Sequence, residues 1–203
     1  MEKNPYPGKF IVFEGLDGSG QTTQSSILEK YTAGMGIKTI LTKEPTKESA
    51  AGMEIREVLG HKKEISPEEL QKLFAEDRKE HLKKTIIPAL KEGNAVISDR
   101  YFFSSLAFGS LECDLEWLIS INNNFLLPDA TFVLMVKPET SVERISKRGL
   151  ETTLFEKLDK LRKVAENYRK FEGRFENLFF IDGDRPIEEI HKEIAEKVTG
   201  ILK

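Results

Sequence analysis

Short apolar runs alternate along the chain with longer segments of helical period. Near-continuous apolar runs are typical of strands buried on both faces of a parallel sheet. They predict five strands, at Phe10–Glu14, Lys38–Thr42, Ala95–Ser98, Thr131–Val136 and Leu178–Ile181. The alternation of strands and helices predicts an α/β fold with right-handed crossovers and helices on both faces of the sheet. Ligands of such sheets bind beyond the carboxyl ends of the strands.

The segments between these runs carry helix start and stop signals. One helix follows Gly20 and should end near Ala33, before a pair of glycines. Another begins at Ser66-Pro67-Glu68-Glu69, where a cap residue, a proline at the first helical position and a glutamate predict a capping box. Pro88 should end or kink that helix. Two later helices are expected, over Phe155–Phe175 and from Pro186 onward.

Composition narrows the class of protein. The 203 residues suit one domain, expected to span residues 1–203, and 39% hydrophobic residues can form a core. The net charge of −3 excludes a globally basic surface for coating nucleic acid, but it leaves room for a local basic pocket. The single Cys113 excludes an intramolecular disulfide and a cysteine-cluster metal site. Neither a membrane span nor a signal peptide is recognisable, so we expect a soluble cytoplasmic protein that binds no membrane.

The most specific local signal directly follows the first predicted strand. It is the segment Gly15-Leu16-Asp17-Gly18-Ser19-Gly20-Gln21-Thr22-Thr23. A buried strand, a glycine-rich turn and a helix start, in this order, predict a phosphate-binding loop. Glycines let successive backbone N–H groups point at an anion, and the helix N-terminus adds partial positive charge. Thr22 stands where the hydroxyl of this motif binds Mg²⁺.

Gln21 departs from the motif, which has lysine at this position. Its amide can donate a hydrogen bond to a phosphate oxygen, but it carries no charge to offset the charge that develops during phosphoryl transfer. Two interpretations follow. Either another cation supplies the charge, or the protein binds a nucleotide without turning it over quickly.

Asp99 and Arg100 close the third predicted strand. A carboxylate at the carboxyl end of a buried strand beside a phosphate loop can hold Mg²⁺, usually through water. The neighbouring Arg100 can bind a phosphate with two of its N–H groups. The alternative is a structural ion pair between the two side chains.

Phe74 and Arg78 lie four residues apart on a predicted helix and therefore share a face. The aromatic ring can stack on a base, and the guanidinium can donate to a carbonyl edge. Alternatively, Phe74 belongs to the core and Arg78 is solvated.

Arg144, Lys147 and Arg148 end another predicted helix, before a polar stretch that contains glycine. Cations at a helix C-terminus are ordinary and stabilising. A mobile lid that carries phosphate-binding cations is the second interpretation.

Taken in order along the chain, these segments resemble the thymidylate kinase family of P-loop nucleoside-monophosphate kinases. The matching segments are Phe13–Gly20 with Thr22-Thr23-Gln24, Lys43-Glu44-Pro45, Phe74–Arg78 with His81, Ile87–Leu90, Asp99–Tyr101 with Ser104–Phe108, Pro128-Asp129, Pro138-Glu139 with Arg144 and Arg148, and Phe155-Glu156 with Tyr168. The resemblance extends from Phe10 to about Asp184. It implies a three-layer P-loop kinase fold, with a five-stranded parallel sheet and a short lid at about residues 144–156.

The resemblance also implies an activity, which is the transfer of the ATP γ-phosphoryl group to dTMP with Mg²⁺, giving dTDP and ADP for dTTP synthesis. By resemblance, residues 15–23 bind the ATP phosphates, Thr22 and Asp99 hold the metal, and the residues that act in transfer are Asp17, Gln21, Arg100 and Arg148. The implied dTMP site consists of Asp17, Arg56, Phe74, Arg78, Arg100, Ser105, Phe108 and Tyr168. Members of the family are usually homodimers, so a homodimer is expected.

Individual roles in the dTMP site also follow from the resemblance. Phe74 stacks on thymine, Arg78 bonds a carbonyl of the base, and Ser105 approaches the base edge. Phe108 fills the space that a ribose 2′-hydroxyl needs. Arg100, with help from Arg56, holds the dTMP phosphate, and Tyr168 closes over the sugar.

Three features depart from the family pattern. Gln21 replaces the loop lysine, Gly109-Ser110 stands where many relatives have Gln-Gly, and the loop interior has no basic residue. The cations expected to compensate are therefore those of the lid, namely Arg144, Lys147 and Arg148. Two alternatives remain. One is a kinase of the same scaffold with another pyrimidine acceptor, such as dUMP or a deoxynucleoside, and the other is a nucleotide-binding pseudokinase.

Overall fold

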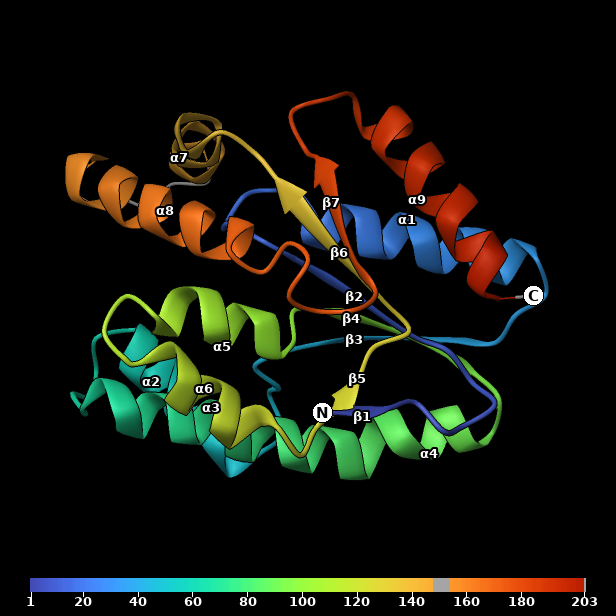
Figure 1. Cartoon of the computed structure of the whole chain (residues 1–203), viewed down its shortest axis with the longest axis horizontal. Coiled ribbons are helices and arrows are strands. Elements are labelled where there is room, and N and C mark those ends of the chain that lie inside the picture. Colours follow the sequence, from blue (N-terminus) through green and yellow to red (C-terminus); the bar gives the residue numbers. More distant parts are fainter. Residues whose placement is uncertain (148–153, 203) are drawn as a thin grey trace.

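A computed structural model describes residues 1–147 and 154–202 of the chain (Figure 1). Five parallel strands form a central sheet in the spatial order β3-β4-β2-β6-β7. Their bounds are β2 Phe10–Gly15, β3 Thr39–Lys43, β4 Ala95–Asp99, β6 Ala130–Met135 and β7 Leu178–Asp182. Every predicted strand is found, with each end within one residue of its predicted position. The five-stranded parallel sheet is therefore confirmed.

Helices cover both faces of this sheet (Figure 1). They are α1 Gln21–Gly34, α2 Ala50–Leu59, α3 Pro67–His81, α4 Ile87–Lys91, α5 Phe102–Gly109, α6 Leu115–Asn122, α7 Pro138–Ser146, α8 Leu154–Arg169 and α9 Ile187–Ile201. Helices α1 and α9 lie together on one face, whereas α3 to α6 lie on the other. Among the described residues, no helix has the length and apolar character needed to cross a membrane.

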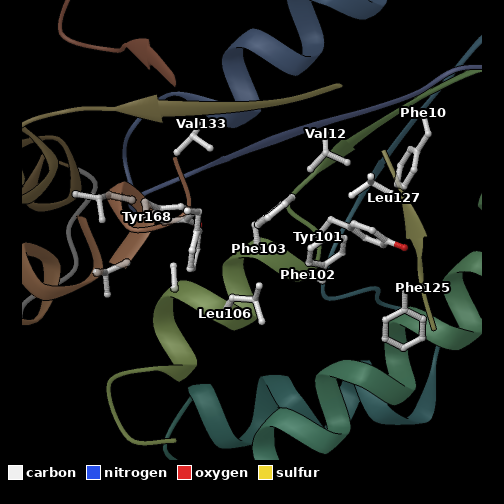
Figure 2. Close-up of a cluster of buried hydrophobic side chains, with 14 of the residues drawn as sticks. Phe10, Val12, Tyr101, Phe102, Phe103, Leu106, Phe125, Leu127, Val133 and Tyr168 are labelled. Carbon is white, nitrogen blue, oxygen red and sulfur yellow. The ribbon is translucent and has the colours of Figure 1, made fainter. Parts of the chain in front are cut away.

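Strand β2 contributes to two separate apolar cores because its successive side chains point to opposite faces of the sheet. Ile11 and Phe13 pack with α1 and α9, and Phe10 and Val12 pack on the opposite side with α5 and its neighbours. Figure 2 shows the second core, in which the aromatic residues at the start of α5 lie against β2. The ring centroids of Phe10 and Tyr101 are 5.0 Å apart in an edge-to-face arrangement. This packing fixes the chain on either side of Arg100, next to the phosphate loop.

Local sequence signals fix the helix ends much as expected. Ser66 and Glu69 form the predicted capping box, with Ser66 Oγ accepting from Glu69 N at 3.2 Å and Glu69 Oε2 accepting from Ser66 N at 2.8 Å. The helix is interrupted ahead of Pro88 by a π-helical turn, η1 Leu82–Ile86, and α4 then begins. Proline lacks the N–H of the regular helical ladder, which accounts for the break.

Several parts of the fold differ from the prediction. Helix α8 ends at Arg169 rather than near residue 175, because Phe171 and Phe175 turn inward and pack on Phe103. Helices α2, α5 and α6 were not predicted. A second, two-stranded parallel sheet, made of β1 Glu2–Lys3 and β5 Leu126–Leu127, was also missed.

Candidate active site

The chemistry-bearing residues gather where three adjacent strands end. Strands β3, β4 and β2 are neighbours in the sheet, and Lys43 of β3 lies directly opposite Asp99 of β4. Strand β2 runs from its own end at Gly15 straight into the glycine-rich loop. The carboxyl edge of the sheet therefore brings together segments that are more than 80 residues apart in sequence.

The loop has the backbone that the sequence predicts. Gly15, Gly18 and Gly20 all have positive φ angles, of 143°, 81° and 104°, which side-chain-bearing residues rarely adopt. At Gly15 there is also no room for a side chain, because a Cβ atom would lie 2.6 Å from the Leu134 carbonyl oxygen. The Gln21 side chain is buried and donates from Nε2 to the Gly15 carbonyl oxygen at 3.0 Å. The amide that replaces the usual lysine thus ties the two ends of the loop together.

Thr22 and Asp99, the two predicted metal ligands, lie side by side. Thr22 Oγ1 donates to Asp99 Oδ2 at 2.5 Å. Lys43 Nζ donates to the same carboxylate oxygen at 2.7 Å and lies 3.5 Å from Thr22 Oγ1. Sequence reasoning gave Lys43 no role. The available signal was its position at the carboxyl end of a predicted strand, next to the loop.

Arg100 reaches back from the end of β4 toward the loop. Its guanidinium donates to Asp17 Oδ1 at 2.8 Å, to the Gly15 carbonyl oxygen at 3.1 Å and to Ser104 Oγ at 2.8 Å. Its φ angle of 77° lies in the left-handed region, which is uncommon for a residue other than glycine and often marks a functional position. The structure therefore pairs Arg100 with Asp17 rather than with Asp99.

A cavity of about 390 Å³ opens between α3 and α5. Its wall includes the three residues expected to contact the base, Phe74, Arg78 and Ser105, and also Phe108, which was expected beside the sugar. Arg78 is only 1% exposed, so the interpretation of a solvated arginine is wrong. Its guanidinium donates to Glu44 Oε2 at 2.9 Å, to Asn122 Oδ1 at 2.6 Å and to Ser105 Oγ at 3.2 Å. We call this the base cavity.

A second cavity, of about 350 Å³, lies against the loop and is called the loop cavity. Its lining includes Gly18, Gly20, Gln21, Thr22 and Asp99. Three further residues line both cavities: Asp17, Lys43 and Arg100. An acid and two cations therefore stand at the junction of a phosphate-binding loop and an aromatic-lined pocket.

Comparison with known proteins agrees with this geometry. The family model described as thymidylate kinase matches residues 13–194. This chain belongs to the thymidylate kinase family. It is 41% identical over 201 residues to a protein of Pyrococcus horikoshii named "Probable thymidylate kinase", covering 96% of this chain and 98% of that protein. A protein of the same name from Thermococcus gammatolerans is 42% identical over 198 residues, or 93% and 94% of the two chains. The "Thymidylate kinase" of Desulfotalea psychrophila is 35% identical over 199 residues, or 97% of each chain.

Membership of the thymidylate kinase family confirms the expected P-loop kinase fold. Of the thymidylate kinase residues expected at the dTMP site, two occupy other places. Tyr168 is fully buried, and its hydroxyl donates to Glu14 Oε2 at 3.0 Å, so it lies beneath the site and does not close over it. Arg56 donates to the carbonyl oxygens of Pro45 and Thr46 at 3.0 and 2.6 Å and lines a neighbouring cavity. It fixes the backbone after β3 instead of reaching the junction.

The lid expected for a thymidylate kinase is described in part. Arg144 of α7 donates to the Gly18 carbonyl oxygen at 3.3 Å and to the Gly183 carbonyl oxygen at 3.4 Å, so it lies against the loop. Lys147 instead forms an exposed ion pair with Glu143 at 2.6 Å. Arg148 and residues 149–153 of the expected lid lie outside the described residues.

Glu14 is a buried part of this site that sequence reasoning did not identify. Its Oε1 accepts from the backbone N–H groups of Tyr101 and Ser104 at 2.9 and 3.1 Å, and its Oε2 accepts from the hydroxyls of Ser104 and Tyr168. Burial raises the pKa of Glu14 to about 7, although nearby Arg100 and these hydrogen bonds oppose the shift. The signal was a single carboxylate inside an otherwise apolar strand. Glu14 joins the end of β2 to the start of α5 and to α8.

Proposed function

We propose that this protein transfers the γ-phosphoryl group of ATP to dTMP, giving dTDP and ADP. The observation that carries the proposal is the junction of the base cavity and the loop cavity at Asp17, Lys43 and Arg100. A nucleoside monophosphate in the first cavity would present its phosphate to a triphosphate held by the loop. Phosphoryl transfer requires mainly in-line positioning and neutralisation of oxyanion charge. The adjoining cavities support the first requirement, and the cations Lys43 and Arg100 at their junction support the second.

The base cavity supports a pyrimidine acceptor. Phe74 offers a flat surface for stacking on the base, and Arg78 and Ser105 offer polar atoms to the base edge. Because Glu44, Asn122 and Ser105 hold the Arg78 guanidinium in place, little side-chain freedom has to be lost when the base binds. Phe108 lies beside Arg100, with the guanidinium carbon 5.4 Å from the ring centroid. In this proposal its ring would fill the space that a ribose 2′-hydroxyl needs.

The loop supports a triphosphate donor through the backbone N–H groups of residues 15–23 and the N-terminus of α1. The oxygen atoms of Thr22 and Asp99 suit Mg²⁺, which prefers hard oxygen ligands and usually completes its coordination with phosphates and water. Among the described residues no group of three or more His, Cys, Asp or Glu side chains is assembled for a metal, which fits such a shared site. When bound, the ion would neutralise phosphate charge.

The cations of the site are held by groups that phosphate oxygens can replace. Arg100 is bound to Asp17 and to a carbonyl oxygen, and Lys43 is bound to Asp99. On substrate binding, Arg100 and Lys43 would donate to the acceptor phosphate, and Asp17 would lie beside the acceptor sugar and phosphate. Arg144 and Arg148 are proposed to add positive charge at the donor, where Gln21 supplies only an amide.

The decisive experiment is product analysis after the protein is mixed with Mg-ATP and dTMP. We expect dTDP and ADP in equal amounts, and we expect dUMP and deoxynucleosides to be poorer acceptors by kcat/KM. A better rate with another pyrimidine acceptor would reassign the substrate. Tight binding of ATP or dTMP in calorimetry with no dTDP formed would favour the nucleotide-binding pseudokinase.

The quaternary structure and the cellular compartment are also proposed from family membership. A homodimer in the cytoplasm is the expectation. Met53 on α2 is 54% exposed and is available to such an interface. Sedimentation equilibrium would test the dimer, and a mass of one chain at all concentrations would contradict it.

A further inference from the structure

Gln71 is a buried amide in the wall of the base cavity. It lies on α3, three residues before Phe74 and seven before Arg78, so the three side chains share one face of the helix. The residue is 7% exposed, and within the described part of the chain its Oε1 atom has no hydrogen-bond partner. A buried acceptor without a donor is unfavourable, because it has lost its hydrogen bonds to water. A ligand that supplies the donor would recover this free energy.

Gly109 of α5 makes the space for this amide. A Cβ atom at position 109 would lie 2.9 Å from Gln71 Cδ and 3.1 Å from its Oε1. Any larger residue would therefore push the Gln71 carboxamide out of its place. The glycine and the glutamine form a complementary pair across the two helices that line the cavity.

The neighbouring polar groups cannot easily accept a hydrogen bond from a base. Arg78 is donor only, and three of its nitrogen atoms already donate to protein oxygens. Glu44 also lines the cavity, but its two carboxylate oxygens contact Arg78 and His81. Tyr101 also lines the cavity, and among the described residues its hydroxyl has no partner, but this hydroxyl is a single atom and Arg78 lies over the ring, with its guanidinium carbon 5.3 Å from the ring centroid. Ser105 Oγ already accepts from Arg78, so among the described residues Gln71 is the side chain of this wall that combines an acceptor without a partner with a donor on the same carboxamide.

We propose that the Gln71 carboxamide binds the imide edge of the pyrimidine base and so determines base specificity. The imide edge of thymine or uracil presents a ring N–H flanked by carbonyl oxygens. A carboxamide offers the matching acceptor and donor, and rotation about its terminal torsion brings either atom to the cavity. This inference rests on the proposed pyrimidine nucleotide substrate, and it adds an acceptor to the donors of Arg78.

The test compares binding of dTMP with binding of 2-deoxyribose 5-phosphate, which lacks the base, by calorimetry. The variant is Gln71→Met, which keeps the length of the side chain and removes its hydrogen-bonding atoms. We expect the Kd for dTMP to rise about tenfold or more, while the Kd for the sugar phosphate stays unchanged. In turnover, KM for dTMP should rise more than kcat falls.

Gln24→Met is the matched control. Among the residues that the structure describes, Gln24 also has a buried Oε1 without a partner, but it lies on α1, where its Nε2 donates to the Ile187 carbonyl oxygen. This control should leave the ratio of the two Kd values unchanged. A second route to the same effect is Gly109→Ala, whose Cβ would displace the Gln71 amide and weaken dTMP binding selectively.

Two outcomes would overturn the inference. One is a Kd for dTMP within about twofold of the parent in both Gln71→Met and Gly109→Ala. The other is equal weakening of dTMP and the sugar phosphate, which would indicate a structural role for Gln71. If either outcome is found and the unmodified protein still forms dTDP, only the role of Gln71 is overturned and the proposed function stands. Unmodified protein that binds no dTMP would overturn both.

Discussion

The base cavity and the loop cavity are built in different ways. In the base cavity the main polar group, Arg78, is 1% exposed and is fixed by Glu44, Asn122 and Ser105. Around the loop the cations are more accessible, and the Lys43 side chain is 56% exposed. Their partners are carboxylates and carbonyl oxygens of the loop region, which phosphate oxygens can replace.

Because of this difference, recognition of the base and transfer of the phosphoryl group depend on different parts of the site. The base cavity is preorganised, so binding of a base requires little rearrangement. The loop cavity must exchange the partners of its cations before it can stabilise a transferred phosphoryl group. Substitutions in the base cavity should therefore change KM or fold stability, whereas those at the junction should change kcat.

The largest effect is expected at Arg100. Arg100→Gly removes the guanidinium and also relieves the left-handed backbone at φ 77°, so the thermal midpoint should change little. We expect kcat for dTDP formation to fall about 10³-fold or more, because the acceptor phosphate would lose a cation that positions it and neutralises its charge. Arg100→Lys keeps the positive charge but loses the planar guanidinium. Its kcat should therefore lie between those of Arg100→Gly and the parent. A kcat within tenfold of the parent for Arg100→Gly would remove Arg100 from catalysis.

Arg144 should contribute less to kcat than Arg100, because its contact with the loop is a single hydrogen bond to the Gly18 carbonyl oxygen. Arg144→Ala is expected to lower kcat about tenfold to a hundredfold, measured at saturating ATP and dTMP. Lys147→Ala is the matched control, since Lys147 is paired with Glu143 at the surface and should change kcat by less than about twofold. Equal effects of the two variants would show that the position of Arg144 over the loop is unimportant.

Glu14, which joins the end of β2 to α5 and α8 beneath the site, allows a test based on the pH dependence of stability. Its pKa of about 7 in the folded protein exceeds the ordinary value of 4.5, so between these values only the folded chain holds the proton. The free energy of unfolding should therefore fall as the pH rises from 4.5 to 7, by up to about 3 kcal/mol from this group.

Glu14→Gln removes this titration, and its amide can still bond to the Ser104 and Tyr168 hydroxyls. Urea denaturation at several pH values should show the variant gaining stability relative to the parent as the pH rises. Parallel curves for the two proteins would contradict the raised pKa.

The smallest effect is expected at Gln21. Restoring the usual lysine with Gln21→Lys adds a charge, but Lys43 and Arg100 already line the loop cavity, and Arg144 contacts the loop. We expect kcat to change by less than about fivefold, measured in the same assay. A rise of a hundredfold would show that charge at the loop limits turnover.

The sequence predicted those features that depend on local pattern. The five strands were found because each is a buried run, and the loop was found because its three positive-φ glycines have no substitutes. Phe74 and Arg78 were placed correctly by helical spacing, with support from the family resemblance. Helix α2, in contrast, has only 10 residues and begins with Ala-Ala-Gly, so it was missed.

The features that depend on tertiary packing could not be predicted. Tyr168 and Arg56 carry suitable groups for a nucleotide, and only the positions of α8 and of the segment after β3 direct them elsewhere. Lys43 becomes a partner of Asp99 through the register of β3 on β4. The Gln71 and Gly109 pair depends on how closely α3 and α5 approach.

The register that sets Lys43 opposite Asp99, together with the pair of Arg100 and Asp17, balances two positive charges with two negative ones at the junction. Such self-neutralisation leaves weak attraction for isolated anions such as inorganic phosphate. A nucleotide accompanied by a divalent cation can satisfy the acids and the bases at the same time. Discrimination against simple anions would thus be built into the resting state of the enzyme.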